Sequence, residues 1–231
     1  MQAGSRALAD SGYAADLAIV GEPTRLKVVT AHKGAVWLRI ETKGKAAHGA
    51  RPELGRNAVY EMGKVVGILA GEYPRKYLTA RHPLLGPATI SVGSIKGGNQ
   101  PNIVPADCVI TVDRRTLPGE TDQRVISELQ ASFRRHGLRP SVRKLHRVPC
   151  PALETDAQLP LVRAFMRAAG QRQPSGVVFF SDAAVLASGG IPSVLFGPGD
   201  IAQAHTADEW VAISQLERGK AILTTFLQSL E

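Results

Sequence analysis

Three side chains that could bind a metal ion follow short apolar runs in this sequence. Glu22 and Asp182 come directly after such runs, and His205 lies in a loop beyond a third. Carboxylates and neutral imidazoles are common zinc ligands, and α/β folds place functional groups in the loops at strand ends. Asp208 and Glu209 could orient the ring of His205 or cap the final helix. Because these residues lie far apart in the chain, their spacing alone favours the alternative that each is a solvated turn residue.

Another candidate, His48, lies in Gly44–Ala58, which reads GKAAHGARPELGRNA. Gly44 and Gly49 allow backbone conformations that are closed to other residues. Pro52 restricts its own φ and keeps the residue before it extended. A histidine in such a stiff turn can be aimed at a group outside its own element. Taken alone, the stretch favours the alternative, a surface loop with an incidental histidine.

The middle of the chain has the periodicity of a two-layer α/β domain. Residues 35–42 alternate apolar and polar side chains, which predicts a half-buried strand, and Ile95 is expected to point inward from a later one. Residues 71–87 contain three prolines and are predicted to be a loop. The predicted elements, in order, are strand 35–42, helix 57–69, strands 88–95 and 108–112, helix 121–136 and strand 141–147.

This β-α-β-β-α-β order is the ferredoxin-like plan. Its alternating strands predict a sheet with one exposed or interface-forming face, and an edge strand could pair with a second subunit. Beyond residue 150 the pattern changes. The continuous apolar runs 176–180 and 192–196 predict buried strands of the parallel type. With helices at 159–169, 183–187 and 213–230, this part is predicted to be α/β.

The composition sets limits on the class of protein. The chain has 231 residues, 44% of them hydrophobic and 21% charged, as in ordinary globular proteins. No apolar run approaches the roughly 20 residues that span a bilayer, and the first residues lack the plan of a signal peptide. We therefore expect a cytoplasmic protein with no membrane partner. Cys108 and Cys150 form no CxxC pair, so they suggest neither a zinc knuckle nor a disulfide framework.

The net charge is +8, with a local excess in Arg134–Arg147. Nucleic-acid binding is one possible meaning. Aromatic residues make up only 5% of the chain and none interleaves with the basic run, so a stacking platform is missing. We interpret the run as a solvated helix end and strand and expect no nucleic-acid partner. The charge could also favour substrates that carry a carboxylate.

Seven short motifs change the interpretation, because their order is that of a known family. They are AIVGEPT at 18–24, HKG at 32–34, GKAAHGARPELGRNA at 44–58, GGNQPNIVP at 97–105, DRRTLPGE at 113–120, SDAAVL at 181–186 and GPGDIAQAHTADEWV at 197–211. From Ala14 onward the chain resembles the dinuclear zinc amidohydrolases that include acetylornithine deacetylase, succinyl-diaminopimelate desuccinylase, aminoacylase and carboxypeptidase G.

The resemblance implies a partial zinc-peptidase-type α/β catalytic domain with an inserted ferredoxin-like dimerisation domain. The catalytic domain would be formed by residues 1–31 and 148–231, and the dimerisation domain by residues 32–147. It also implies a homodimer, and a substrate that is a small N-acyl amino acid or peptide. The cofactor would be two zinc ions, with cobalt or manganese as substitutes.

The resemblance further implies roles for individual residues. Glu22 matches the carboxylate that binds one zinc ion, and His205 matches the histidine that binds the other. His48 matches a histidine of the dimerisation domain that reaches the partner's active site and stabilises an oxyanion there.

Four more residues match positions in the family's substrate site. Asn102 and Arg115 match residues that hold polar groups of the substrate, and the planar guanidinium of Arg115 suits a carboxylate. Ser181 and Asp182 fall in the loop that lines the substrate cleft. For Asp182, a structural role in orienting that loop is an equal alternative.

The family's upstream motifs have no match in this sequence. They are a His-x-Asp pair, a bridging aspartate and a Glu-Glu pair whose first member is the general base. No histidine precedes His32 and no glutamate precedes Glu22. We therefore expect the C-terminal part of an amidohydrolase that removes an N-acyl group from an amino acid or cleaves a small peptide, inactive alone and with incomplete zinc occupancy. The alternative is a non-catalytic truncated product that dimerises through its ferredoxin-like domain.

Overall fold

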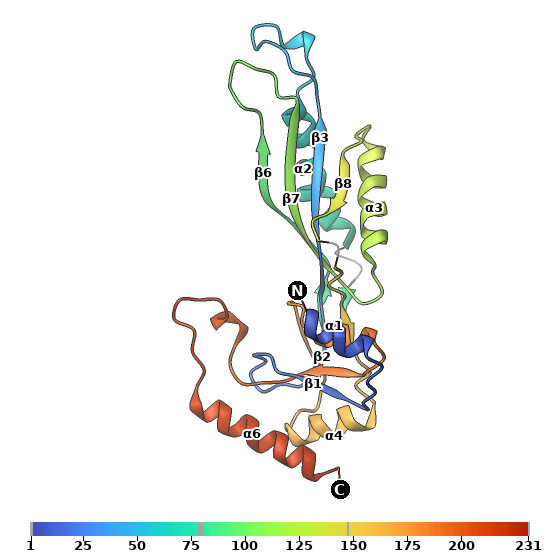
Figure 1. Ribbon diagram of the computed structural model, residues 1–231, viewed down its shortest axis with the longest axis vertical. Coiled ribbons are helices and arrows are strands. Elements are labelled where there is room, and N and C mark those ends of the chain that lie inside the picture. The colour runs from blue at the N-terminus through green and yellow to red at the C-terminus, as the bar shows by residue number, and fades with distance from the viewer. Residues whose placement is uncertain (1, 78–80, 147, 231) are drawn as a thin grey trace. The chain divides into compact units, whose positions relative to one another are not determined.

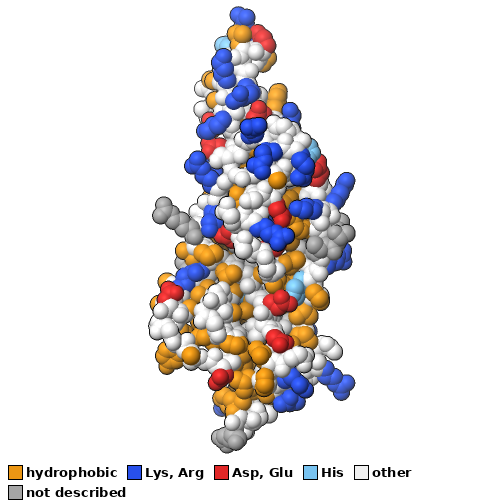
Figure 2. Space-filling model, turned by 90° about the vertical axis from the view of Figure 1, so that its right-hand side faces the viewer, with side chains coloured by type: hydrophobic (Ala, Val, Ile, Leu, Met, Phe, Trp, Pro, Cys, Tyr) orange, Lys and Arg blue, Asp and Glu red, His pale blue; other side chains and the backbone are white. Residues whose placement is uncertain are grey.

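The computed structural model describes residues 2–77, 81–146 and 148–230, and the chain divides into two compact units (Figure 1). Unit 1 is formed by Met1–Gly34, Pro83–Leu85 and Cys150–Glu231, and unit 2 by Ala35–His82 and Gly86–Pro149. The division suggested from the sequence, after residues 31 and 147, did not include Pro83–Leu85 in the first unit. Figure 2 shows many Lys and Arg side chains over unit 2 and many hydrophobic side chains over unit 1.

Unit 2 has the predicted ferredoxin-like plan. Its main elements are, in chain order, β3 (Gly34–Lys43), α2 (Ala58–Tyr77), β6 (Thr89–Gly97), β7 (Asp107–Thr116), α3 (Asp122–Arg135) and β8 (Ser141–Lys144). The strands are ordered β6-β7-β3-β8 in the sheet. The short strands β4 (Arg81–His82) and β5 (Gly86–Pro87) form a separate antiparallel pair, and a single 3-10 turn covers Pro52–Leu54. The predicted fold class is therefore confirmed for this unit.

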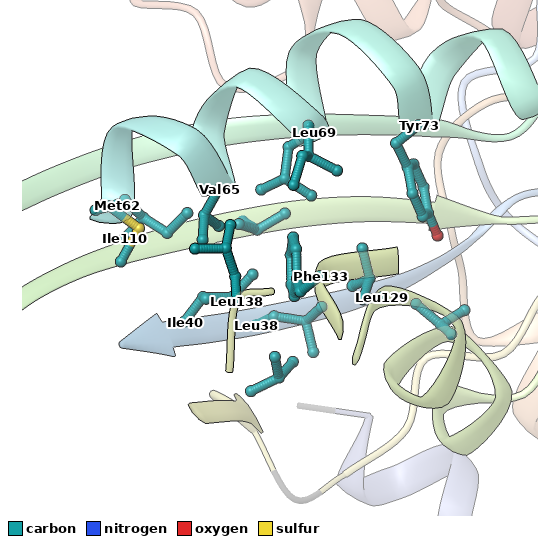
Figure 3. Packing of buried hydrophobic residues seen from close by; sticks show 14 of the residues in the cluster. Leu38, Ile40, Met62, Val65, Leu69, Tyr73, Ile110, Leu129, Phe133 and Leu138 are labelled. Carbon is teal, nitrogen blue, oxygen red and sulfur yellow. The ribbon is translucent and has the colours of Figure 1, made fainter. Parts of the chain in front are cut away.

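The two helices cover one face of this sheet and bury its apolar side chains (Figure 3). Leu38 and Ile40 of β3 are fully buried, as are Leu129 and Phe133 of α3. The alternating burial along β3 and β7 leaves the other face of the sheet open. Full burial of each such side chain contributes about 1.5–3 kcal/mol, so this core organises the unit around the predicted alternation. Thr121 caps α3, because its Oγ1 accepts the N–H of Arg124 at 3.2 Å.

Two details of unit 2 differ from the sequence prediction. Helix α2 continues through Pro74 to Tyr77, where a loop was predicted. A proline inside a helix removes a hydrogen bond, but Tyr73 and Tyr77 are buried in the core and keep the helix intact. Ile95 is 56% exposed because it lies on the edge strand, beyond a register shift between Val92 and Ser94. Of the predicted strand 141–147, position 147 lies outside the described residues.

Unit 1 contains a mixed sheet in the order β1-β11-β2-β10, with β9 also paired to β2. Strands β1 and β11 run parallel to each other, as do β2 and β10, while β11 and β2 run antiparallel. The strands are β1 (Ala18–Val20), β2 (Val29–His32), β9 (Leu153–Glu154), β10 (Ser175–Val177) and β11 (Ser193–Leu195). The helices are α1 (Ala3–Asp10), α4 (Pro160–Ala168), α5 (Ala183–Ser188) and α6 (Ile213–Gln228), with a 3-10 turn at Ile201–Gln203.

The core of unit 1 has two clusters, one packed against helices α4 and α6 and the other against helix α5. Phe165 packs against Phe196 and Phe226, with ring centroids 4.9 Å and 4.7 Å apart. The predicted strand 176–180 ends at Val177, and Val178 is 61% exposed. The α/β prediction is confirmed, since parallel strands and helices alternate here. Within the described ranges, no helix has both the length and the apolar character to cross a membrane.

Candidate functional site

The loop that carries Glu22 is held against the loop that leads to His205. Thr24, which is 6% exposed, donates its backbone N–H to the carbonyl of Gly197 at 3.2 Å. The Thr24 hydroxyl donates to the carbonyl of Lys27 at 2.7 Å and accepts the N–H of Gly197 at 3.1 Å. A single buried hydroxyl therefore joins two segments that lie far apart in the sequence.

Backbone strain and close packing accompany this contact. Arg25 and Leu26 both have left-handed backbones, with φ of 55° and 61°. The guanidinium of Arg25 forms an ion pair with the carboxylate of Asp200. A Cβ atom at Gly197 would lie 2.6 Å from the carbonyl oxygen of Glu22, so only glycine permits this approach. Strain of this kind persists only where the surroundings over-determine it, which indicates that the position of Glu22 is closely specified.

The Glu22 carboxyl group is half-buried and lies within the field of a second carboxylate. Burial raises the pKa of Glu22, and the negative charge of Asp182 raises it further. Glu22 also lines a cavity of about 630 Å³, with Lys220 and apolar side chains of α6 on its wall. A cation beside Glu22 would stabilise the charge that burial and Asp182 disfavour.

His205 lies in an exposed loop with a left-handed backbone, at φ 64°. Its backbone N–H donates to the Oε2 atom of Glu209 at 3.3 Å. Helix α6 begins after Ala212 and has no side-chain cap. The capping role predicted for Asp208 or Glu209 is therefore wrong: the carboxylate of Glu209 holds the His205 loop instead.

Ser181 and Asp182 lie at the start of α5 and have different surroundings. Ser181 is buried, and its Oγ accepts the N–H of Ala183 at 3.2 Å. Its carbonyl accepts a hydrogen bond from the side-chain amide of Gln2 at 2.9 Å. The side chain of Asp182 occupies the N-cap position without capping the helix. The Ser181 hydroxyl thus serves the local structure, while the charge of Asp182 acts on Glu22.

The possible metal ligands on the described part of the chain do not form a complete metal centre. Among these residues, no three or more His, Cys, Asp or Glu side chains form a group that could hold a metal ion. Asp182 acts on the charge of Glu22, and over the same residues no such group joins Glu22 to His205. Structural zinc sites use four protein ligands and catalytic sites three, so we derive no chemical step through a metal from these residues.

In unit 2 the His48 loop is paired with the Asn102 loop. The N–H of Gly49 donates to the carbonyl of Asn102 at 2.7 Å, and the N–H of Val104 donates to the carbonyl of Ala47 at 2.9 Å. His48 is exposed, and its Nδ1 atom accepts the N–H of Ala50 at 3.1 Å. Because a neutral imidazole carries one proton, this contact assigns the proton to Nε2. His48 is therefore held as a hydrogen-bond donor.

The glycines of this loop serve a different purpose from the one predicted. Neither Gly44 nor Gly49 has a positive φ. A Cβ atom at Gly44 would instead lie 2.0 Å from the carbonyl oxygen of Arg56 and 2.9 Å from that of Pro105. The prediction of special backbone conformations is wrong for these two residues, and close backbone approach explains them.

Arg115 lies at the other end of strand β7 from the His48 loop. Its Nη2 atom donates to the carboxylate of Asp113 at 2.9 Å, and both side chains are about one-third exposed. The eight-residue rise from Asp107 to Arg115 spans roughly 27 Å. The structure therefore brings Asn102 to His48, but it does not bring Arg115 to either of them within one chain.

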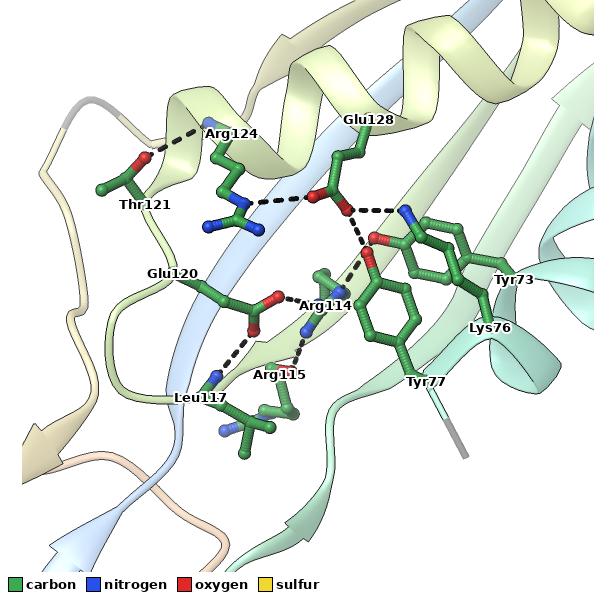
Figure 4. A network of polar contacts seen from close by, with 10 residues as sticks. All are labelled: Tyr73, Lys76, Tyr77, Arg114, Arg115, Leu117, Glu120, Thr121, Arg124 and Glu128. Atoms are coloured by element: carbon green, nitrogen blue, oxygen red, sulfur yellow. Dashed lines mark hydrogen bonds and ion pairs between the residues drawn. The ribbon is translucent and has the colours of Figure 1, made fainter. Parts of the chain in front are cut away.

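Arg114, which sequence reasoning passed over in favour of Arg115, is fully buried at the centre of a polar network (Figure 4). Its Nε donates to the hydroxyl of Tyr73 at 3.1 Å, and its Nη2 donates to Glu120 at 2.6 Å. Its Nη1 donates to the carbonyl of Arg115, and its guanidinium lies 4.7 Å from the ring centre of Tyr77. The alternation of side chains along β7 could have indicated this burial, because the even-numbered residues, Arg114 among them, are the buried ones.

Comparisons with known proteins agree with these features. Residues 30–139 match the family model described as the peptidase dimerisation domain of the M20 family. An acetylornithine deacetylase from Myxococcus xanthus is 34% identical over 95% of this chain and 59% of its own length. One from Pasteurella multocida is 31% identical over 92% of this chain and 56% of its own length. The chain thus spans less than two thirds of the length of these curated relatives.

Solved structures support the fold. An aminopeptidase from Bacillus cereus superimposes with a TM-score of 0.75 at 23% identity, covering 98% of this chain and 60% of its own. An M20 family metallo-carboxypeptidase from Sulfolobus solfataricus superimposes with a TM-score of 0.70 at 16% identity. The match covers 98% of this chain and 66% of the carboxypeptidase. At these identities the likeness concerns the fold alone.

Proposed function

We propose that this chain, which matches the M20 peptidase dimerisation domain over residues 30–139 and is similar to acetylornithine deacetylases, forms part of a zinc-dependent amidohydrolase. The reaction is removal of an N-acyl group from an amino acid, or cleavage of a small peptide. The observation that carries the proposal is the match to the Myxococcus xanthus deacetylase over 95% of the chain. The catalytic part would be residues 1–31 and 148–231, and the dimerisation part residues 32–147.

In unit 1 the proposed metal ligands are Glu22 and His205, one for each zinc ion. Support comes from the clamp at Thr24, which holds the Glu22 loop against the Gly197 loop, and from the raised pKa of Glu22 beside Asp182. The remaining ligands and the general base would come from polypeptide outside these 231 residues. Ser181 and Asp182 would line the substrate cleft, with Ser181 acting through the loop that its hydroxyl stabilises.

In unit 2 the proposed catalytic residue is His48, and the substrate-binding residues are Asn102 and Arg115. The donor state of His48 suits an oxyanion that develops when water attacks an amide. Because Arg115 and His48 lie at opposite ends of β7, both could act on one substrate only if they came from different subunits. The Arg115 side chain would bind the substrate carboxylate.

We propose that the second subunit binds along the edge strand β6 and the neighbouring face of α2. Strand β6 lies at one end of the sheet order. Added Cβ atoms at Gly63, Gly67 and Gly71 would meet nothing within 4 Å, so this face of α2 allows close approach of another helix. Light scattering of the 231-residue chain at micromolar concentration should give a dimer.

A bulky substitution on this face tests the interface. Gly67→Leu should weaken the dimer while leaving the monomer folded, since leucine has a better helix propensity than glycine. Ser127→Leu on the exposed side of α3 is the matched control. A dimer that persists unchanged in Gly67→Leu, or a wild-type monomer, would contradict the interface.

The hydrolase proposal can be tested with a chimera. The chain replaces the matching 59% of the Myxococcus xanthus relative, and the product is assayed with a panel of N-acyl amino acids. Glu22→Ala and His205→Ala should each lower zinc content and abolish turnover. His48→Ala should lower kcat by about 10²–10³, as loss of an oxyanion donor does. His136→Ala, at the C-terminal end of α3, should leave kcat unchanged.

Two outcomes would contradict the proposal. A chimera that is folded, dimeric and zinc-loaded but hydrolyses no member of the panel would refute the amidohydrolase function. Full kcat in the His48→Ala chimera would refute the donor role alone.

A further inference from the structure

The net positive charge of this protein comes from unit 2. Within its segments 35–82 and 86–149 the sequence holds 19 Lys and Arg against 9 Asp and Glu, a net charge of +10. The rest of the chain holds 9 Lys and Arg against 11 Asp and Glu, a net charge of −2. Together these give the +8 of the whole chain. The excess of Lys and Arg therefore produces a positive electrostatic field around unit 2, and not around the whole chain.

Part of this charge lines a groove of about 490 Å³ in unit 2. Its walls come from the end of β3, the segment before α2, and the turn that joins α3 to β8. The basic run Arg134–Arg147, which the proposed hydrolase function does not use, supplies one wall. The four cations that line the groove are Lys43, Arg56, Arg139 and Arg143, and the two carboxylates are Glu41 and Glu61.

Two of the four cations are held by carboxylates, and two are not. The Nζ of Lys43 lies 2.6 Å from Glu41, and the Nε of Arg56 lies 3.7 Å from Glu61. Over the described part of the chain, no carboxylate forms an ion pair with Arg139 or Arg143. The guanidinium groups of these two residues therefore keep their full hydrogen-bonding capacity toward a ligand.

One wall of the groove is ordered by the backbone. The Nη2 of Arg56 donates to the carbonyl of Lys43 at 3.2 Å, and the backbones of Lys45 and Arg56 exchange hydrogen bonds of 2.8 Å and 2.9 Å. Gly44 permits this close approach. Arg56 and Lys43 are thus placed beside each other before any ligand arrives, which lowers the entropy cost of binding.

We propose that this groove of unit 2 binds a small, multiply charged anion, such as a polyphosphate or polycarboxylate, between Arg139, Arg143 and the Lys43–Arg56 pair. The planar guanidinium groups can each contact two anionic oxygens. The site is independent of the proposed hydrolase chemistry, because none of its residues is assigned to that chemistry.

The surroundings favour a small anion over a nucleic acid. No aromatic side chain lines the groove, so bases would have no surface on which to stack. Glu41 and Glu61 lie within the groove and would repel a continuous phosphate backbone. A compact anion can instead contact Arg139 and Arg143, which outweigh Glu41, the carboxylate whose charge Arg143 already stabilises.

Isothermal titration of the 231-residue protein tests the proposal, with tripolyphosphate, citrate, acetate and a twelve-nucleotide single-stranded DNA as probes. At 150 mM NaCl, tripolyphosphate or citrate should bind with one site per chain, and acetate should not. The double variant Arg139→Gln/Arg143→Gln should weaken that binding by at least about tenfold, as loss of hydrogen bonds to charged groups does. Neither substitution touches the core, and circular dichroism checks the fold.

A matched control separates the site from the total charge. Arg163→Gln/Arg167→Gln removes the same two charges from the exposed face of α4 in unit 1 and should leave the affinity unchanged. The proposal is overturned if neither multivalent anion binds, or if both double variants weaken binding equally. It is also overturned if the DNA binds more tightly than tripolyphosphate and the Arg139→Gln/Arg143→Gln variant loses that affinity. The groove would then be a nucleic-acid-binding surface.

Discussion

Replacing Glu120 with glutamine is expected to destabilise unit 2 by about 3 kcal/mol. The substitution keeps the size of the side chain but removes the anion that lies 2.6 Å from the fully buried guanidinium of Arg114. Breaking a buried ion pair by removing one partner costs roughly 3–5 kcal/mol. The lower end applies here, because Arg114 keeps the hydroxyl of Tyr73 and the carbonyl of Arg115 as acceptors.

A double-mutant cycle isolates the pair. Arg114→Met should also be destabilising, since among the described residues it leaves the Glu120 carboxylate with the N–H of Leu117, at 2.7 Å, as its hydrogen-bond donor. The double variant Arg114→Met/Glu120→Gln should cost clearly less than the sum of the two single changes. A coupling energy of about 2 kcal/mol is expected for groups that share one network.

The two tryptophans make the assay specific to unit 2. Trp37 lies on β3 of unit 2 and Trp210 lies in unit 1, where it is 62% exposed. In a Trp210→Phe background, fluorescence during urea unfolding reports on unit 2 alone. A Glu120→Gln cost below about 1 kcal/mol, or additive effects in the cycle, would refute the view that this network stabilises the unit.

Two further changes test other parts of the structure. Gly44→Ala should unfold the His48 loop and lower the melting temperature of unit 2, because its Cβ would lie 2.0 Å from a backbone carbonyl oxygen. An unchanged melting temperature would argue against this packing. Burial lowers the pKa of His32 to about 4, so the unfolded chain, with a pKa near 6.5, binds the proton first as pH falls. Stability contributed by His32 is complete above pH 6.5, and about 2 kcal/mol should be lost by pH 5. Urea unfolding at pH 7 and pH 5 should show this loss in the wild type and not in His32→Gln.

Local periodicity was sufficient to predict most elements of both units. The alternation of Val36, Leu38 and Ile40 specified a half-buried strand because side chains on a strand point to opposite faces every second residue. The spacing of Val125, Leu129 and Phe133 specified α3 for the corresponding helical reason. Where packing competes with local preference, the prediction was wrong: buried Tyr73 and Tyr77 carry α2 through Pro74.

For the candidate site, the sequence by itself determined which residue types stand near strand ends and in which order the motifs occur. It could not determine that the hydroxyl of Thr24 meets Gly197, or that Arg114 is buried while Arg115 is partly exposed. It also could not show that Arg56 and Arg143 line one groove. Periodicity records the burial of each side chain, whereas contacts between distant segments depend on how the packed elements place their loops. Only the tertiary structure decides those contacts.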